Sequence, residues 1–271
     1  MARTTKAVIL ARGLGSRMRA SDESATLDAE QSRVADAGMK GMIPIGRPFL
    51  DYVMSALADA GITDICLVIG PEHDAVRRYY GGEVALERVR VHFAVQVEPL
   101  GTADAVAASA EFAAGDPVLV MNADNYYPVR AIDDLAALGT SGLIGFAPGP
   151  LVALSNIPVE RVRKFALVVE EGGWLTQIVE KPDDATFDRL SDRALVSMNL
   201  WSFSPIIFDA CARVRPSARG ELELQDAVRV AMEEFGERFR VVPCAAGVLD
   251  LSSRLDIAEV ARRMAGVEVT L

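Results

Sequence analysis

The segment 6–19 combines residue types that can bind phosphate. Its apolar residues 7–10 are followed at once by Gly13 and Gly15, and then by Arg17. Glycine lets a loop lie close against a ligand, and backbone N–H groups in such a loop, with a helix behind it, form an anion site. Arginine can donate two hydrogen bonds to one phosphate group. We therefore interpret this segment as a binding site for the phosphates of a nucleotide.

Two well-known phosphate-binding loops do not match this segment. A Walker A loop ends in Gly-Lys-Ser or Gly-Lys-Thr, whereas this chain reads Gly15-Ser16-Arg17. The dinucleotide fingerprint needs a third glycine where Met18 stands. A plain strand-to-helix turn with two solvated arginines therefore remains the alternative to a nucleotide site.

A candidate base-binding site follows the strand predicted over 89–95. Gln96 comes directly after it, and its amide offers a donor and an acceptor to the edge of a base. Gly101 would let a flat group approach the backbone, and Thr102 would cap a helix predicted over 103–112. An ordinary loop before a capped helix is the alternative.

Two charged residues, Lys40 and Asp124, stand where they could serve the same site. Asp124 follows the strand predicted over 118–121, and ligands of open α/β sheets bind at the carboxyl ends of strands. Mg²⁺ prefers carboxylate, phosphate and water oxygens, so Asp124 is a candidate metal ligand, with a turn-forming aspartate as the alternative. Lys40 precedes the apolar residues 41–45 and could turn back toward the first loop.

The elements that must position these residues alternate between strand and helix in the first half of the chain. Apolar runs predict strands over 7–10, 65–69, 89–95 and 118–121, and helical spacing predicts helices over 49–61, 73–80 and 103–112. This alternation indicates a mostly parallel, doubly wound sheet. In the second half we predict strands over 143–147, 165–171, 174–180, 194–203 and 239–243, and helices over 205–214, 221–235 and 256–264. With no linker or internal repeat between them, residues 1–271 are predicted to form one domain.

The polar residues 20–37 are predicted to form a solvated helix. Ser21 would cap it, Asp22 and Glu23 would lie in its first turn, and Gly38 would end it. The functional alternative is a lid beside the phosphate loop.

Composition limits the partners of the protein. The chain has 271 residues, 51% of them hydrophobic, with a formal net charge of −10 and a pI of about 4.8. Such an acidic chain is not expected to bind nucleic acid, which needs a basic face, although a few local cations suffice for a nucleotide. No apolar signal region or membrane-spanning run is visible, so we expect a soluble, cytoplasmic protein with no membrane partner.

Cysteine and histidine usage argues against a metal site built from these residues. Cys66, Cys211 and Cys244 are widely spaced in apolar surroundings, which predicts buried structural thiols. The two histidines, His73 and His92, are too few for a histidine-rich metal site, and we interpret both as surface or loop residues.

Six motifs, in order along the chain, resemble the sugar-1-phosphate nucleotidyltransferase family, which makes nucleoside-diphosphate sugars. They are the loop ARGLGSR from Ala11, Lys40 in MKGMIPIGRPFLDYV, QVEPLGTADAV from Gln96, Asp124 in VLVMNADN, Glu180-Lys181-Pro182, and GELELQDAV from Gly220. Asp250, in VLDLSSRLDI, falls where the family has its second metal aspartate. The likeness covers nearly the whole chain.

The resemblance implies a fold, a reaction and a set of site residues. The fold would be α/β, Rossmann-like and GT-A-like, with a mixed, mostly parallel sheet in a three-layer αβα arrangement. Residues 1–130 would be the nucleotide-binding half, and 131–271 the sugar-phosphate-binding half with C-terminal helices. The reaction would join a nucleoside triphosphate and a sugar 1-phosphate and release pyrophosphate. The implied roles are catalysis for Arg17 and Lys40, nucleotide binding for Leu10, Ala11, Gly13, Gly15, Ser16, Gln96, Gly101 and Thr102, sugar-phosphate binding for Glu180, Lys181 and Asn199, and Mg²⁺ binding for Asp124 and Asp250.

The chain departs from the family pattern at several positions near the implied site. Arg12 stands where the family has a small residue, and Phe165-Ala166 where a Tyr-Gly pair is common. Met198-Asn199 replaces a pair of smaller residues. These departures bear on the identity of the sugar and leave the reaction class intact.

The sequence leaves alternatives for the substrates, the function class and the oligomeric state. Gln96 disfavours guanine, so UTP or dTTP is the first choice, with ATP and CTP open and glucose 1-phosphate as the default sugar. A nucleotide-sugar-binding sensor or regulatory subunit that has lost catalysis is the second hypothesis, supported by the altered motif around Asp250. A glycosyltransferase on a related sheet and an NAD-dependent enzyme are less favoured. The oligomeric state is open, a homo-oligomer included.

Overall fold

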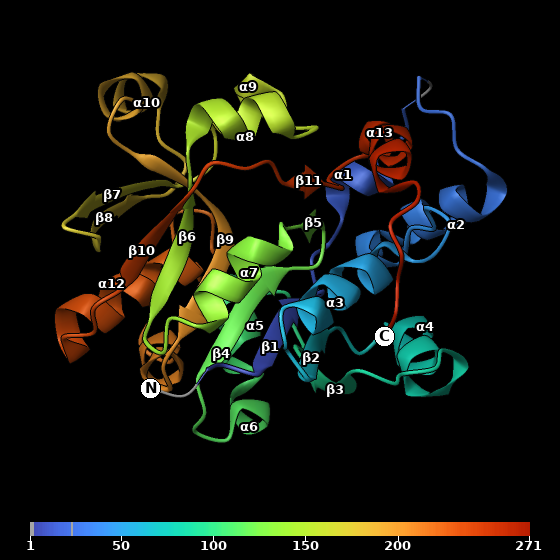
Figure 1. The fold of residues 1–271 in the computed structure, drawn as a ribbon, viewed down its shortest axis with the longest axis horizontal. Coiled ribbons are helices and arrows are strands. Elements are labelled where there is room, and N and C mark those ends of the chain that lie inside the picture. Colours follow the sequence, from blue (N-terminus) through green and yellow to red (C-terminus); the bar gives the residue numbers. More distant parts are fainter. Residues whose placement is uncertain (1–2, 23) are drawn as a thin grey trace.

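The fold is built around a nine-stranded mixed sheet (Figure 1). The computed structural model describes residues 3–22 and 24–271, so Glu23 lies outside the described residues. The sheet has the order β3-β2-β1-β4-β9-β6-β10-β8-β7, and a small second sheet pairs β11 with β5. The strands are β1 (Lys6–Leu10), β2 (Asp64–Ile69), β3 (Arg90–Val95), β4 (Val118–Asn122), β5 (Asn125–Tyr126), β6 (Gly142–Phe146), β7 (Leu167–Glu171), β8 (Trp174–Val179), β9 (Leu195–Phe203), β10 (Arg240–Cys244) and β11 (Leu249–Asp250).

Strands β1 to β4 pair in parallel, as their apolar runs predict. Within β1, Ala7 and Ile9 belong to the core on one side of the sheet, and Val8 belongs to the core on the other. A strand buried on both faces needs an apolar residue at every position, which explains the unbroken run. Parallel pairing places the carboxyl ends of these strands, and the loops that follow them, at one edge of the sheet.

Helices cover both faces of the sheet. α3 and α7 pack on one side, and α5, α11 and α12 pack together on the other (Figure 1). The helices are α1 (Ser16–Arg19), α2 (Ala29–Ala37), α3 (Phe49–Asp59), α4 (Asp74–Arg78), α5 (Thr102–Ala107), α6 (Ala110–Ala113), α7 (Val129–Ala136), α8 (Pro148–Leu154), α9 (Val159–Val162), α10 (Asp184–Leu190), α11 (Ile206–Cys211), α12 (Leu224–Phe235) and α13 (Arg254–Met264), with a 3₁₀ turn η1 (Lys40–Met42) and a π turn η2 (Tyr79–Glu83). The predicted α/β class is confirmed.

The sheet is mixed, as predicted, but it is not mostly parallel, because the second half of the chain adds mainly antiparallel pairs, while β10 pairs in parallel with β6. β9 runs antiparallel to both β4 and β6. β7 pairs with β8 and also returns to β9, so β9, β6, β10, β8 and β7 close into a ring. This partly barrel-like arrangement depends on pairing between distant segments, which apolar runs do not encode. The strands predicted over 165–171 and 174–180 are present as β7 and β8, which form a hairpin joined at Gly172-Gly173.

Several helices begin or end at residues other than those predicted. Residues 20–37 do not form one helix from Ser21, because α2 begins only after Asp28. The Asp28 carboxylate accepts a hydrogen bond from Gln31 N at 2.8 Å and closes a capping box, a stronger helix start than Ser21 offers. The helix predicted over 103–112 is split into α5 and α6, and the sequence pattern did not reveal α7, α8, α9 or α10.

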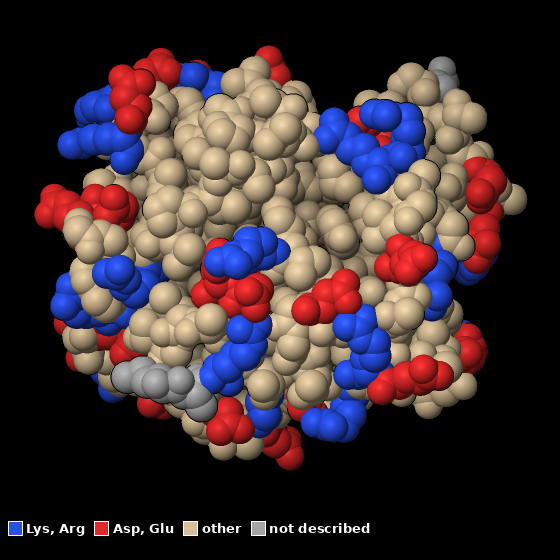
Figure 2. Space-filling model, viewed as in Figure 1, with Lys and Arg blue, Asp and Glu red and all other residues tan. Residues whose placement is uncertain are grey.

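The surface carries mixed charge. On the face shown in Figure 2, acidic and basic side chains lie side by side, both at the edges and across the lower half, and leave a broad uncharged area over α8. None of the described helices is both long enough and apolar enough to cross a bilayer. All three cysteines are free thiols, with Cys66 and Cys211 buried as predicted and Cys244 half-buried.

Candidate active site

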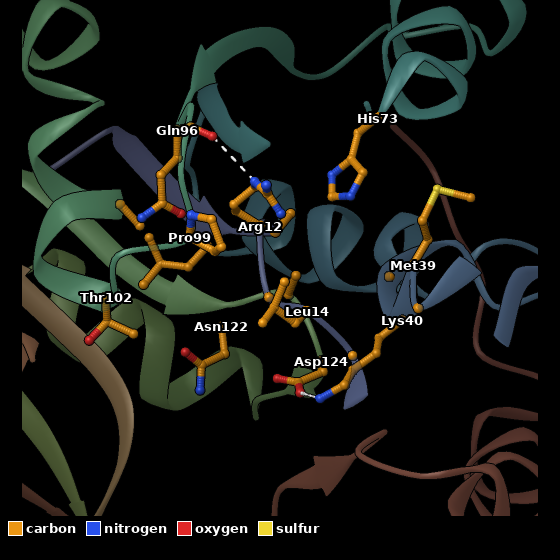
Figure 3. Close-up of a pocket in the computed structure, with 18 of the residues that line it drawn as sticks. Arg12, Leu14, Met39, Lys40, His73, Gln96, Pro99, Thr102, Asn122 and Asp124 are labelled. Carbon is orange, nitrogen blue, oxygen red and sulfur yellow. Dashed lines mark hydrogen bonds and ion pairs between the residues drawn. The ribbon is translucent and has the colours of Figure 1, made fainter. Parts of the chain in front are cut away.

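A cleft of about 450 Å³ opens at the carboxyl ends of β1, β3 and β4 (Figure 3). It brings together most of the predicted site residues from segments far apart in the sequence. The lining includes Leu10, Ala11, Gly13, Gly15, Ser16, Arg17, Lys40, Gln96, Gly101, Thr102, Asp124 and Asn199. Glu180, Lys181 and Asp250 are not among its lining residues. The nucleotide half of the predicted site is therefore assembled in one cavity.

The loop between β1 and α1 is shaped by a close glycine contact. Gly15 has a φ of +61°, and a Cβ there would collide with the backbone of Gly38. At Gly13 a Cβ would meet no other atom within 4 Å, so this glycine is not required by packing. Because α1 spans only 4 residues, the loop N–H groups and the exposed Arg17 side chain, and not a long helix, supply the positive end.

Lys40 and Asp124 form an ion pair across the cleft, with Nζ 2.6 Å from Oδ2 (Figure 3). η1 carries the lysine, and the loop after β4 carries the aspartate. The two side chains are 18% and 21% exposed, so both can be reached from the cleft. An ammonium group and a carboxylate in contact neutralise each other. An entering phosphate can therefore compete for the lysine, and an entering cation can compete for the aspartate.

Gln96 is buried at the end of β3, and its amide nitrogen is fully engaged. Nε2 lies 3.0 Å from Gly101 O and 2.7 Å from Asp104 Oδ2. Both partners can only accept, so the nitrogen must face them and Oε1 is left as an acceptor. The predicted role as donor and acceptor is therefore wrong in part, because the protein itself uses the donor.

Gly101 and Thr102 line the cleft for reasons other than those predicted. Gly101 has a φ of +126°, and a Cβ there would collide with the backbone of Leu222. The glycine thus makes room for the chain and not for a flat ligand. Thr102 Oγ1 accepts a hydrogen bond from Leu224 N at 2.9 Å, so it satisfies the first turn of α12 instead of capping α5.

Arg12 and His73 also line the cleft, and both are buried. Arg12 Nε lies 3.2 Å from Gln96 O, and its Nη1 lies 2.9 Å from Glu72 Oε1. His73 Nδ1 accepts a hydrogen bond from Gly70 N at 3.3 Å. Burial, with a smaller effect of the Arg12 charge, lowers the pKa of His73. His73 therefore lies in a loop, as interpreted, but not at the surface. The sequence signal for Arg12 was its departure from the family pattern.

The second half of the chain contributes Asn199 to the cleft. Asn199 lies on β9 with a φ of +57°, and its Oδ1 accepts a hydrogen bond from Gln225 Nε2 at 3.1 Å. Lys181 is exposed. Glu180 Oε2 is buried and makes no hydrogen bond within the described part of the chain. Burial, together with the charge of Glu223, raises the pKa of Glu180 to about 7.

Asp250 is buried and already engaged by protein donors. Its Oδ1 accepts hydrogen bonds from Asn125 Nδ2 at 3.0 Å and from Ser252 Oγ at 2.9 Å. Its Oδ2 lies 2.8 Å from Arg161 Nη1. Burial and the negative charge of Asp124 raise the pKa of Asp250. The charge of Asp124 thus affects the pKa of Asp250, but Asp250 is already paired with Arg161.

A model of the family described as Nucleotidyl transferase matches residues 6–243. The chain belongs to the nucleotidyl transferase family. A low-salt glycan biosynthesis nucleotidyltransferase of Haloferax volcanii is 31% identical over 231 residues, which cover 84% of this chain and 57% of that protein. A glucose-1-phosphate thymidylyltransferase of Streptomyces griseus is 30% identical over 226 residues, 83% of this chain and 56% of that protein. The chain spans about half the length of these curated relatives.

Solved structures share the fold of this nucleotidyl transferase family member. A UDP-glucose pyrophosphorylase complexed with UDP-glucose superposes with a TM-score of 0.73 at 19% identity, covering 96% of this chain and 97% of that one. A UDP-glucose pyrophosphorylase from Acinetobacter baumannii gives a TM-score of 0.72 at 18% identity, covering 98% and 95%. At this identity the likeness shows the fold alone.

Magnesium fits the described residues at Asp124 but not at a pair of aspartates. Asp124 lines the cleft, and its contact there with Lys40 can be exchanged. Asp250 would have to give up Arg161 before it could bind a metal ion. Within residues 3–22 and 24–271, no three His, Cys, Asp or Glu side chains gather as a metal cluster would require. The predicted role of Asp250 as a direct ligand therefore does not fit this arrangement.

Proposed function

We propose that the protein transfers a nucleotidyl group from a nucleoside triphosphate to a sugar 1-phosphate and releases pyrophosphate. The observation that supports this best is the shared cleft, lined by Arg17, Lys40, Asp124 and Gln96. Lys40 and Asp124 meet at one end of the cavity, and Gln96 lies at the other (Figure 3). Charged groups at one end and a buried amide at the other suit the phosphates and the base of one nucleotide, with Arg12 beside the amide.

The reaction requires two anions to meet. A phosphate oxygen of the sugar 1-phosphate forms a bond to the α-phosphorus of the triphosphate. The bond from that phosphorus to the oxygen bridging the β-phosphate breaks, and its electron pair leaves with pyrophosphate. The attacking oxygen is already ionised, so no general base is needed. The residues therefore contribute alignment and neutralisation of charge.

The charged residues of the cleft divide this task. Arg17 and the N–H groups of residues 13–15 would bind the departing pyrophosphate. Lys40 would leave Asp124 and bind the transferring phosphate. Asp124, with phosphate and water oxygens, would hold Mg²⁺, which neutralises further phosphate charge when bound.

Glu180, Lys181 and Asn199 would receive the sugar 1-phosphate. Glu221 lines the cleft, and its charge is among those that raise the pKa of Glu180. The unpartnered Glu180 Oε2 would accept hydrogen bonds from sugar hydroxyls. Lys181 would contact the sugar phosphate. Asn199 lines the cleft and would lie between the two substrates.

UTP or dTTP is the proposed nucleotide, and glucose 1-phosphate the proposed default sugar. Gln96 Oε1 is an acceptor, which suits the N3–H of uracil or thymine. The Streptomyces griseus relative is described as a glucose-1-phosphate thymidylyltransferase, which agrees with this choice.

A sensor or regulatory protein that binds a nucleotide sugar without turnover is the second candidate. The observation that favours it is Arg161, which already neutralises Asp250. A site that has lost its second metal ligand can retain ligand binding while losing catalysis.

A matrix of nucleoside triphosphates against sugar 1-phosphates, read by pyrophosphate release with and without magnesium, separates the two candidates. The proposal expects magnesium-dependent release with at least one pair, strongest for UTP or dTTP. Binding of a nucleotide sugar without release from any pair would favour the sensor. Arg78 is not among the residues that line the cleft, so Arg78→Ala serves as a control and should release pyrophosphate like the unaltered protein.

A further inference from the structure

Arg12 occupies an unusual position at the base end of the cleft. It belongs to the loop after β1, yet its side chain crosses the end of β2 and reaches the end of β3. Gly70, directly after β2, makes this path possible, since a Cβ there would lie 2.5 Å from Arg12 Nε and 2.7 Å from its Cδ. Figure 3 shows Arg12 between Gln96 and His73.

Two contacts hold the Arg12 guanidinium in this place. Its Nε lies 3.2 Å from Gln96 O, and its Nη1 lies 2.9 Å from Glu72 Oε1. The side chain is only 9% exposed, and the residue lines the cleft. A guanidinium has five N–H donors and no acceptor, so donors remain for a ligand. The group is therefore a fixed donor and not a freely moving surface charge.

The neighbouring Gln96 supplies the complementary acceptor. Its Nε2 is engaged by Gly101 and Asp104, which leaves Oε1 for the cleft. The wall thus presents an acceptor beside a donor that carries positive charge. Uracil and thymine offer the matching pair, an N3–H next to the O4 carbonyl. Cytosine offers the reverse, a bare N3 next to an N4 amino group, which would place acceptor against acceptor and donor against donor.

We propose that Arg12 selects the base by donating a hydrogen bond to the carbonyl beside the imide N–H that Gln96 accepts. This inference rests on the proposed function and assigns its base preference to a residue that departs from the family pattern. The selectivity is for a keto group over an amino group and separates uracil and thymine from cytosine. Positive charge for the phosphates is provided elsewhere, at Arg17 and Lys40.

The decisive experiment compares UTP with CTP, which differ only in the atoms under discussion. For the unaltered protein we expect kcat/KM with UTP to exceed kcat/KM with CTP by a factor of about 100 or more. For Arg12→Ala we expect this factor to fall to about 10 or less, mainly because kcat/KM with UTP decreases. Gly70→Ala should also lower the ratio, because the added methyl group displaces Arg12 without removing its charge. Arg17→Ala is the matched arginine control and should weaken both nucleotides alike.

Equal losses with UTP and CTP in Arg12→Ala would overturn the proposal, since they would indicate a phosphate or purely structural role. If Arg12→Ala does not fold, Gly70→Ala and Arg12→Lys carry the same comparison. Calorimetric titration with UTP and CTP supplies a readout without turnover. Absence of pyrophosphate release from any pair, combined with a UTP preference in binding that Arg12→Ala removes, would reject the proposed function and support the role of Arg12.

Discussion

At the scale of single residues, Asp124 is the acidic residue of the cleft that lies against Lys40. We expect Asp124→Ala to lower turnover by at least ~100-fold, because it removes the carboxylate that can hold magnesium beside the phosphates. Asp116→Ala is a matched control, since Asp116 also pairs with a lysine, Lys6 at 2.8 Å, and is not among the cleft-lining residues. Steady-state pyrophosphate release measures both variants. Activity of Asp124→Ala within a few-fold of the unaltered protein would reject its role as metal anchor.

The buried pair of Asp250 and Arg161 has a structural consequence that can be measured. Arg161→Ala would leave two buried carboxylates, Asp250 and Asp256, without the cation that they share. We expect a loss of about 2–4 kcal/mol in the free energy of unfolding. Arg163→Ala is the control, because its partners Asp184 and Asp188 are exposed and such pairs contribute about 0–1 kcal/mol. Chemical denaturation of both variants measures these losses. Equal losses in the free energy of unfolding for the two variants would contradict a stabilising role of Arg161 at the buried carboxylates.

Glu180 should make the stability of the protein depend on pH. Its pKa is raised to about 7 in the folded chain, so the folded state binds the proton more tightly than the unfolded state. The stabilisation is present at low pH and is lost as the pH rises through about 7. Relative to Glu180→Gln, we expect the unaltered protein to lose about 1–2 kcal/mol between pH 5 and pH 8, less than the full shift implies because solvent reaches the site.

Thermal and chemical unfolding at several pH values test this expectation. Glu171→Gln, at the exposed end of β7, controls for the general loss of a carboxylate. A stability difference between the unaltered protein and Glu180→Gln that stays constant from pH 5 to pH 8 would show that Glu180 is not the group responsible.

At the scale of elements, α13 contacts α1 and α2 from the far end of the chain. Arg254, its first residue, lies with Nε 2.9 Å from Met18 O and also pairs with Asp36 on α2. Figure 1 shows α13 beside α1 and near α2. The lid interpretation of residues 20–37 stays a prediction. The contacts show that one residue of α13, Arg254, binds both α1 and α2.

Removing these contacts should loosen nucleotide binding without altering the chemistry. For Arg254→Ala we expect the KM for the triphosphate to rise about 10-fold, while the KM for the sugar 1-phosphate stays the same. Arg262→Ala on the same helix is the control, because Arg262 is 70% exposed and pairs with Glu259, also on α13. Initial-rate measurements with each substrate varied in turn decide. An unchanged triphosphate KM would remove Arg254 from this positioning role.

At the scale of the whole molecule, the two predicted halves are joined by the sheet itself. β4 of the first half pairs with β9 of the second, and β5 pairs with β11. We therefore expect one cooperative unfolding transition and no independent folding of residues 1–130. Both tryptophans, Trp174 and Trp201, lie in the second half, so their fluorescence reports that half, while far-ultraviolet circular dichroism reports the whole chain.

Coincident midpoints from the two probes would support a single folding unit. A fluorescence midpoint separated from the dichroism midpoint, or a cooperative transition in the isolated fragment 1–130, would contradict it. The fragment is the sharper test, because it exposes the edge of β4 that β9 covers in the intact chain.

The local sequence pattern was sufficient to predict features that depend on neighbouring residues alone. The apolar run of β1 predicted a strand buried on both faces, and the glycines after it predicted a tight loop, which lines the cleft. Phosphate binding by this loop stays a prediction. Lys40, Gln96 and Asp124 were likewise placed at the site from their positions after or near such strands, and all three line the cleft.

Tertiary structure alone decided which distant groups meet. The antiparallel insertion of β9 between β4 and β6, the use of Thr102 by α12, and the pairing of Arg161 with Asp250 join segments that are far apart in sequence. The same holds for Arg12, whose path across Gly70 to Gln96 follows from the order of β1, β2 and β3 in the sheet. A side chain's type and neighbours along the chain predict what it can donate or accept, but its partner depends on which strands lie next to each other.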